Sequence, residues 1–210
     1  MKPKVIVIVG QTATGKSALA VRIAKRFNGE VISADSRQVY KGLDIGSGKI
    51  TKTEMRDIPH HLLDVANPKK QFSVALYKKL TEQKIKKIVA RGKTPILCGG
   101  TGFYIDAVTR GIVLPEVPPN KILRDKLAKK SSTTLFKMLE KLDQSRAKNI
   151  DPNNKVRLIR AIEIVKKLGK VPQITQEDSP YEFIKIGLQM PEKNLQRKIS
   201  TRLRNRLRNG

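Results

Sequence analysis

The sequence has 210 residues, 39% of them hydrophobic, which is enough to bury the core of one α/β domain or of one domain with an insertion. Lysine and arginine number 44 against 18 aspartate and glutamate residues, and this formal net charge of +26 indicates a polyanionic partner, unless it reflects a general lysine-rich bias. The composition excludes an internal disulfide, because Cys98 is the single cysteine, and no apolar run of about 18 residues is present to span a membrane.

The first predicted strand, Val5–Val9, leads directly into the glycine-rich segment Gly10–Ser17, which has the spacing G-x-x-x-x-G-K-[ST]. A helix is predicted from Lys16 to Phe27. Between a strand and a helix, such a segment holds phosphate oxygens with backbone N–H groups, while Lys16 reaches the phosphates and the Ser17 hydroxyl binds Mg²⁺. Taken alone, the motif predicts an ATP site, and the alternative is a glycine turn that binds nothing. Because the strand starts close to the N-terminus, we expect no signal peptide and a cytoplasmic chain.

The following part of the chain alternates predicted strands and helices. Asn28 and Gly29 end the first helix. Polar residues without clear periodicity occupy positions 36–56. Because strands separated by helices favour right-handed crossovers, this pattern predicts an α/β fold with a P-loop NTPase-like parallel sheet flanked by helices. The predicted elements are strands at Glu30–Asp35 and Thr94–Cys98, a further short strand within Ile58–Asp64, a helix at Phe72–Ala90 and a helix starting at Phe103.

The composition changes after Leu114, where prolines at 115, 118 and 119 mark a boundary. Residues 121–170 carry 15 Lys/Arg against 5 Asp/Glu and contain no strand-like run. We therefore predict a P-loop α/β core of residues 1–117 and 180–210, with a helical insertion of residues 118–179. The predicted elements here are helices at Ile122–Ala128, Thr133–Leu142 and Val156–Leu168, a strand at Phe183–Leu188 and a basic helix at Lys193–Arg208 that Gly210 caps.

Asp35 ends one predicted strand and Thr101 follows another, at the edge where open parallel sheets bind ligands. Asp35 would lie near the bound phosphates, where a carboxylate can hold Mg²⁺ or accept a proton; the alternative is a turn or capping residue. Thr101 lies in the turn Gly99–Gly102, where glycines let the backbone approach a ligand; the alternative is a helix N-cap.

Other candidate residues have structural alternatives. His60 and His61 are the only histidines, and without neighbouring metal ligands we expect them to be structural. Arg157 and Arg160 lie on one face of a predicted helix, where two guanidinium groups could clamp a phosphate backbone. The alternative is an ion pair with Glu163.

Several segments together resemble the tRNA dimethylallyltransferase family, whose members prenylate the adenosine beside the anticodon. They occur in the family's order over nearly the whole sequence, and Asp-Ser-Arg-Gln-Val-Tyr combined with Gly-Gly-Thr-Gly is much more particular than the phosphate loop. Family members usually continue beyond the basic segment at which this sequence stops, so it resembles a C-terminally short member. Phe103 stands where the family often has Leu. The segments are Gly10–Ser17, Ala34–Gly46, His60–Asp64, Gly99–Tyr104 and Asp151–Glu163.

The resemblance implies that the loop holds the diphosphate of dimethylallyl diphosphate, and that the adenosine amine attacks the allylic carbon as diphosphate leaves. It implies three catalytic residues: Asp35 as acceptor and general base, Thr101 beside the diphosphate, and Lys16, which neutralises the leaving group together with Mg²⁺ near Ser17. The implied donor site comprises Gly10, Gln11, Thr12, Ala13, Thr14, Gly15, Lys16, Ser17 and Arg202. The implied tRNA site comprises Asp35, Ser36, Arg37, Gln38, Thr101, Arg124, Val156, Arg157 and Arg160, with the target base flipped out of its stack.

Other functions remain open at this point. A small-molecule or nucleoside kinase shares the phosphate loop but would need an arginine-bearing lid, for which no obvious motif is present. A prenyltransferase acting on a free adenine nucleotide would not explain the basic insertion, and a non-catalytic RNA-binding protein would not explain the phosphate loop. We expect a monomer without membrane association whose partners are the anticodon stem-loop of tRNA and dimethylallyl diphosphate, with Mg²⁺ as cofactor.

Overall fold

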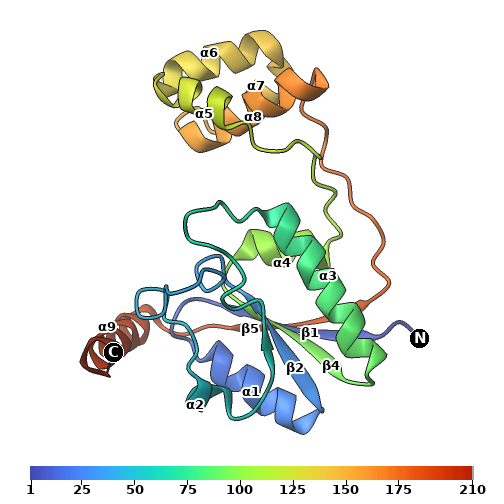
Figure 1. Ribbon diagram of the computed structural model, residues 1–210, viewed down its shortest axis with the longest axis vertical. Coiled ribbons are helices and arrows are strands. Elements are labelled where there is room, and N and C mark those ends of the chain that lie inside the picture. The colour runs from blue at the N-terminus through green and yellow to red at the C-terminus, as the bar shows by residue number, and fades with distance from the viewer. Residues whose placement is uncertain (210) are drawn as a thin grey trace. The chain divides into compact units, whose positions relative to one another are not determined.

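The computed structural model describes residues 1–209, so Gly210, predicted to cap the last helix, lies outside the described residues. The chain folds into two compact units (Figure 1). One unit consists of Met1–Ile112 together with Gln176–Gly210, and the other is Val113–Thr175. Of the described helices, none is both long and apolar enough to cross a bilayer.

The first unit is built on a five-stranded sheet in which all pairings are parallel, as predicted. The strand order is β3-β2-β4-β1-β5. Register places Val9 opposite Gly99, and Gly99 opposite Ala34, so three strands end level at one edge of the sheet. The strands are β1 (Lys4–Gly10), β2 (Gly29–Ala34), β3 (His60–His61), β4 (Thr94–Gly99) and β5 (Glu182–Leu188).

The segment Ile58–Asp64 holds a short strand, as predicted, and the strand consists of His60–His61. Leu62 and Asp64 adopt φ angles of 61° and 55°. This left-handed backbone is incompatible with an extended strand and ends the pairing with β2. The preceding loop also contains a short helix that the periodicity did not predict, α2 (Lys52–Met55). Its Thr51 and Glu54 form a reciprocal capping box, which stabilises even a short helix.

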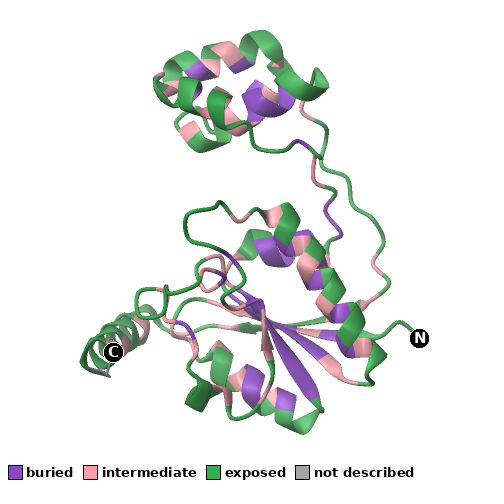
Figure 2. Cartoon of the chain, viewed as in Figure 1, coloured by how far each residue is buried: buried purple, intermediate pink, exposed green. Residues whose placement is uncertain are grey.

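Helices cover both faces of the sheet (Figure 1). Alternate strand residues point to opposite faces, and both faces are apolar, as expected for a parallel sheet with helical crossovers. Val7 and Leu97 pack on the side of α3 (Val74–Ala90) and α4 (Gly102–Thr109). Ile8, Ile96 and Cys98 pack on the other side, against α1 (Lys16–Arg26). Figure 2 shows β2 and β4 buried along most of their length. The unit ends with the basic helix α9 (Glu192–Asn209).

The second unit is a small helical bundle with its own apolar core, formed by residues that include Leu127, Leu135, Leu139, Leu158 and Ile162. A side chain caps the start of each helix: Asn120, Ser131, Asp143 and Asn154 each accept a backbone N–H. The short α7 was not predicted. The helices are α5 (Lys121–Ala128), α6 (Ser132–Leu142), α7 (Gln144–Lys148) and α8 (Lys155–Leu168).

Glu163 of α8 is the polar centre of this bundle, since its side chain is only 2% exposed. One oxygen accepts from the backbone N–H of Asn120 at 2.7 Å and from Nε of Arg124 at 2.9 Å. The other oxygen accepts from Nη2 of Arg124 at 2.6 Å and from Arg160. Although burial acts in the opposite direction, these partners lower the pKa of Glu163 to about 2. The carboxylate therefore joins the start of α5 to α8.

Replacing Glu163 with glutamine is expected to destabilise the helical unit by about 3 kcal/mol, because it removes a buried charge that pairs with two partly buried guanidinium groups. Since the folded-state pKa lies below the ordinary value of 4.5, the stabilisation is complete above that pH and is lost as the pH falls toward about 2. Urea unfolding followed by circular dichroism measures both effects. Glu140→Gln, an exposed change in the same unit, is the matched control, and equal losses in the two variants would contradict the role of Glu163.

Candidate active site

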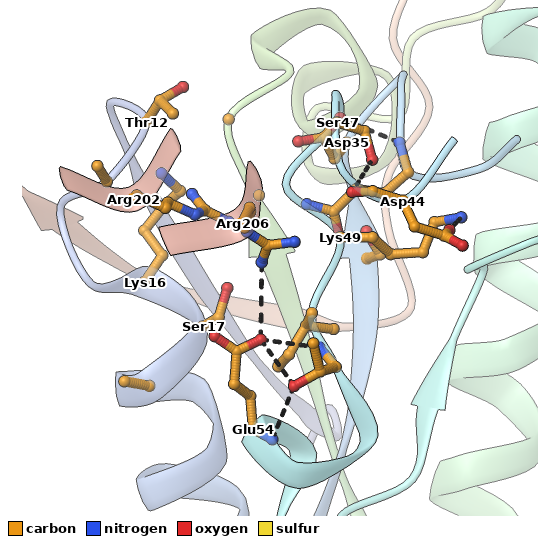
Figure 3. A pocket seen from close by; sticks show the side chains of 18 of the residues that line it. Thr12, Lys16, Ser17, Asp35, Asp44, Ser47, Lys49, Glu54, Arg202 and Arg206 are labelled. Carbon is orange, nitrogen blue, oxygen red and sulfur yellow. Dashed lines mark hydrogen bonds and ion pairs between the residues drawn. The ribbon is translucent and has the colours of Figure 1, made fainter. Parts of the chain in front are cut away.

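A cavity of about 1770 Å³ lies in the α/β unit at the edge where β1, β2 and β4 end (Figure 3). It is lined by the loop after β1, the residues after β2 and β4, α2 and one face of α9. The cavity thus gathers segments that are far apart in the sequence. Its lining includes eight residues predicted to contact substrate: Thr12, Ala13, Gly15, Lys16, Ser17, Asp35, Gln38 and Arg202.

The loop Gly10–Ser17 has the conformation that its glycines were predicted to allow. Gly10 has a φ of +151°, and a Cβ there would lie 2.4 Å from the carbonyl oxygen of Leu188. Gly15 has a φ of +92° at the N-cap of α1, where no side chain caps the helix and the first turn carries no acidic residue. The first N–H groups of α1 are thus left available, and with the helix dipole they favour an anion.

Positive charge is concentrated beside this loop. The Lys16 amino group donates to the carbonyl of Gln11, which also accepts from Thr14 Oγ1 at 2.8 Å. Burial and the nearby charge of Arg202 lower the pKa of Lys16. Burial and the charge of Arg206 likewise lower the pKa of Arg202. Two half-buried cations close to one another favour an anion between or beside them, because an anion would offset their mutual repulsion.

Asp35 is the first residue after β2 and lines the cavity. Its Oδ1 accepts the backbone N–H of Arg37 at 2.8 Å and that of Gln38 at 3.4 Å. The turn role that was the alternative for Asp35 is therefore present. It occupies one carboxylate oxygen and fixes the side chain at the cavity, so it is compatible with a chemical role.

Thr101 occupies the N-cap position of α4, but its side chain does not cap the helix. Its hydroxyl instead accepts from the backbone N–H of Ser36 at 2.9 Å and donates to the Ser36 hydroxyl at 3.3 Å. Its own N–H donates to the carbonyl of Ala34 at 3.1 Å. A Cβ on Gly99 would lie 2.1 Å from that carbonyl oxygen, so a glycine is required for this approach. The Gly-Gly-Thr-Gly turn and the Asp35 turn are thus joined.

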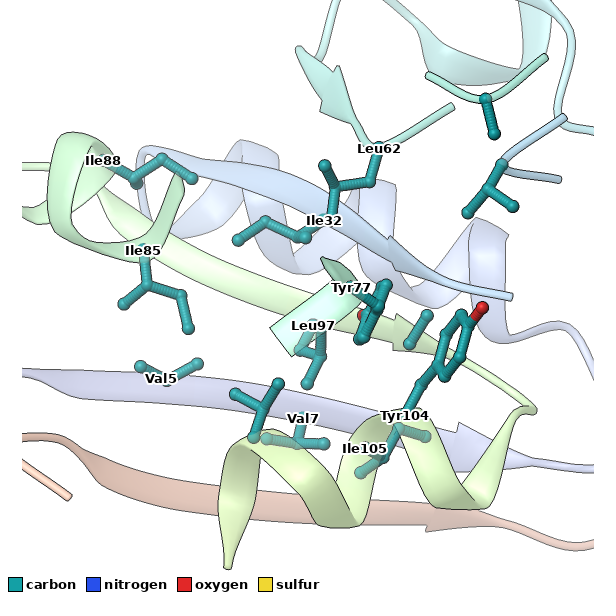
Figure 4. Packing of buried hydrophobic residues seen from close by; sticks show 14 residues of the cluster. Val5, Val7, Ile32, Leu62, Tyr77, Ile85, Ile88, Leu97, Tyr104 and Ile105 are labelled. Atoms are coloured by element: carbon teal, nitrogen blue, oxygen red, sulfur yellow. The ribbon is translucent and has the colours of Figure 1, made fainter. Parts of the chain in front are cut away.

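Two tyrosines of the apolar core connect the helices α3 and α4 to these two turns (Figure 4). Tyr77 of α3 stacks on Tyr104 of α4 with ring centroids 4.0 Å apart. Tyr77 is fully buried, and its hydroxyl donates to the carbonyl of Ser33 at 3.1 Å. Because Ser33 precedes Asp35 by two residues and Tyr104 follows Thr101 by three, packing of α3 against the sheet fixes both functional turns.

Lys49 and Gly48 contribute to the site and were not predicted individually. The Lys49 side chain is 6% exposed, and its amino group binds the carboxylates of Asp44 and Asp64 and the carbonyl of Tyr40, the last at 2.9 Å. The carbonyl of Gly48 accepts from Arg202 and, at 3.4 Å, from Gln38 Nε2. A lysine directly after the glycines of a polar loop was the only signal in the sequence.

Replacing Lys49 with methionine is expected to loosen the loop of residues 41–50. The three hydrogen bonds that the Lys49 ammonium donates are lost, which is expected to lower the free energy of opening the loop by about 2 kcal/mol. Hydrogen exchange at the loop amides of Gly48 and Lys49 is therefore expected to become roughly 30-fold faster. Hydrogen exchange resolved by residue measures this change. The control is Lys41→Met, which removes an exposed charge in the same segment. Unchanged protection in Lys49→Met would contradict the role.

His61 belongs to a buried ion-pair cluster, whereas His60 and Cys98 lie at the lining of the cavity. His61 Nε2 lies 2.7 Å from the buried Glu30 carboxylate, which Arg91 and Lys93 also bind. His60 Nδ1 lies 2.8 Å from the carbonyl of Ile58, and burial lowers the pKa of His60. Cys98 is buried, and burial raises its pKa to about 12. In the described part of the chain, no group of three His, Cys, Asp or Glu residues is arranged to hold a metal ion.

The remaining predicted tRNA-binding residues lie in the helical unit. Arg160 forms the ion pair with Glu163 that was its alternative role, and Arg124 binds the same carboxylate. Val156 is 76% exposed, and Arg157 is also exposed, at the start of α8. A contact of these four residues with tRNA stays a prediction.

The fold and the site define a class: a P-loop α/β protein whose phosphate-binding loop shares its cavity with a carboxylate from the neighbouring strand end. Residues 38–210 match the model of the family described as IPP transferase. The chain belongs to this IPP transferase family, which confirms the resemblance found in its motifs.

Relatives of the chain are consistent with that assignment. The chain is 43% identical to a tRNA dimethylallyltransferase of Caldanaerobacter subterraneus subsp. tengcongensis, with all of this chain and 70% of the relative aligned. The full-length tRNA isopentenylpyrophosphate transferase structure from Bacillus halodurans has a TM-score of 0.67 and 41% identity over 100% of this chain and 67% of its own. A eukaryotic dimethylallyltransferase acting on tRNA has a TM-score of 0.80 and 31% identity over 99% of this chain and 54% of its own.

Proposed function

We propose that the chain transfers the dimethylallyl group of dimethylallyl diphosphate to the N6 amine of the adenosine adjacent to the anticodon in tRNA. One observation supports this most strongly. A loop suited to a diphosphate and the carboxylate of Asp35 line the same cavity, where a nucleophile and a leaving group can be held together. The proposal includes action as a monomer in the cytoplasm.

In the proposed reaction, the adenosine N6 forms a bond to the allylic C1 of the donor as the C1–O bond breaks. The bonding electrons leave with diphosphate, and N6 loses a proton to Asp35. The loop N–H groups, Lys16 and Arg202 stabilise the charge that develops on the leaving oxygen. Thr101 is proposed to contact the diphosphate beside the breaking bond, since its hydrogen bonds to Ser36 hold it next to the Asp35 turn.

Mg²⁺ is the proposed cofactor. Ser17 exposes its hydroxyl in the first turn of α1, at the cavity. This donor fits Mg²⁺, which in phosphate sites retains waters and uses few protein ligands together with substrate phosphate oxygens. When bound, the ion would neutralise charge on the diphosphate.

tRNA is the proposed acceptor, because the positive charge of the chain suits a polyanion. The target adenosine must leave its stack for N6 to reach the allylic carbon. Ser36, Arg37 and Gln38, which follow Asp35, are proposed to contact the extruded base and its neighbours. Arg124, Val156, Arg157 and Arg160 are proposed to contact the tRNA from the helical unit.

Incubation of the chain with labelled dimethylallyl diphosphate, Mg²⁺ and an anticodon stem-loop tests the proposal. Label is expected in the adenosine next to the anticodon, and a stem-loop with that adenosine replaced by guanosine is the matched control. Free AMP in place of RNA tests the adenylate prenyltransferase, and labelled ATP tests the kinase. Transfer from ATP, or prenylation of AMP in preference to the stem-loop, would overturn the proposal.

A further inference from the structure

Basic side chains from one face of α9 line the cavity. Lys198, Arg202 and Arg206 line it at intervals of four residues, which places them on the same side of the helix. Figure 3 shows Arg202 and Arg206 reaching from α9 toward the phosphate loop and α2. Arg202 already has a partner in the carbonyl of Gly48 and a proposed role with the diphosphate. Arg206 has no role in the reaction described so far.

Arg206 has an incomplete partner. Its side chain is 17% exposed, and its contact with the Glu54 carboxylate is 3.7 Å long, beyond hydrogen-bond distance. The same Glu54 oxygen already accepts from the backbone N–H of Thr51 at 2.8 Å and from the Thr51 hydroxyl at 3.1 Å, as part of the capping box of α2. A guanidinium carries five N–H donors, and a long ion pair leaves most of its binding capacity for another acceptor.

We propose that Arg206 is a phosphate ligand of this cavity that exchanges Glu54 for a substrate phosphate group when one binds. A phosphate can accept two parallel N–H bonds from a guanidinium, which a carboxylate 3.7 Å away does not. The exchange leaves no buried charge unpaired, because Glu54 is 55% exposed and keeps its bonds to Thr51. The phosphate belongs to the donor diphosphate or to the RNA backbone, and this assignment of substrates rests on the proposed function.

Two substitutions with opposite expected effects test the exchange. Arg206→Gln removes the phosphate ligand and is expected to weaken binding of one substrate by about tenfold. Glu54→Gln removes the competing charge and is expected to strengthen binding of that same substrate by about two- to threefold. Glutamine can replace glutamate in the capping box, so α2 is retained. Arg204→Gln removes an exposed arginine of the same helix and is the matched control, with an expected change below about twofold.

Calorimetry with inorganic pyrophosphate and, separately, with an anticodon stem-loop identifies the source of the phosphate. Weaker binding of pyrophosphate alone assigns Arg206 to the donor. Weaker binding of the stem-loop alone assigns Arg206 to the RNA backbone. In that case the slope of the logarithm of the binding constant against the logarithm of the salt concentration is expected to decrease in magnitude by about one. Both readouts are independent of turnover, so a failure of prenyl transfer would not be mistaken for a failure of this inference.

Two results would overturn the exchange. If Arg206→Gln and Glu54→Gln weaken binding of the substrate to the same extent, the pair is only a structural ion pair between α2 and α9. If Arg206→Gln and Arg204→Gln have equal effects on both ligands, only the general charge of the helix is involved.

Discussion

Replacing Asp35 with asparagine is expected to lower the rate of dimethylallyl transfer by about 10²- to 10⁴-fold, the usual contribution of a general base. Asparagine keeps the side-chain oxygen that accepts the N–H groups of Arg37 and Gln38, so the turn is retained. What is lost is the basic oxygen that is proposed to accept the proton of the adenosine amine. Single-turnover transfer to a labelled stem-loop measures the rate, and binding of the same stem-loop is expected to change by less than about threefold.

The choice of substitution decides how this result is interpreted. Asp35→Ala would remove both the base and the two hydrogen bonds of the turn, so it would disturb Gln38 as well. Asp57→Asn is the matched control, because it makes the same change at an exposed carboxylate of the same unit that does not line the cavity. Equal losses of rate and of stem-loop binding in Asp35→Asn would show that the residue is structural.

Replacing Lys16 with methionine is expected to lower the transfer rate by about 10²- to 10³-fold and to weaken pyrophosphate binding, because the leaving diphosphate loses a half-buried cation. Burial, with a further contribution from Arg202, lowers the pKa of Lys16. As the pH rises through that lowered pKa, the ammonium group deprotonates. The rate is therefore expected to fall at a pH below the ordinary lysine value of 10.5.

The pH profile distinguishes this role from a structural one. Arginine keeps its charge throughout that range, so Lys16→Arg is expected to restore part of the rate and to remove the alkaline decrease. Steady-state rates with saturating stem-loop at increasing pH provide the measurement. An alkaline decrease that persists unchanged in Lys16→Arg would assign it to another group.

Local signals predicted the sheet and its polar edge. Apolar runs such as Val5–Val9 and Thr94–Cys98 are each followed by a glycine, and both form buried strands at the predicted places. Asp35 and the turn with Thr101 were recognisable because each follows such a run. These features depend on residues close in the sequence, which is why the pattern was sufficient.

The residues that the sequence did not single out depend on contacts across the fold. The buried amino group of Lys49 binds two carboxylates, Asp44 nearby in the sequence and Asp64 from another segment. The basic character of α9 was evident, but which of its arginines face the cavity depends on how α9 packs beside α2. The capping box at Thr51 and Glu54 is a visible pattern that could have revealed α2. Periodicity alone missed it because the helix is only four residues long.

The carbonyl of Gly48 has a consequence for how this site tolerates mutation. It is the acceptor for both Arg202 and Gln38, and since it belongs to the main chain, no side-chain substitution at position 48 can delete it. Any other residue there would nevertheless add a Cβ 2.8 Å from Arg202 Nη2, at a φ of +60° that favours glycine. Substitution of Gly48 is therefore restricted, although glycine carries no chemically active side chain. The constraint comes from its backbone conformation and from the space that Arg202 occupies beside it.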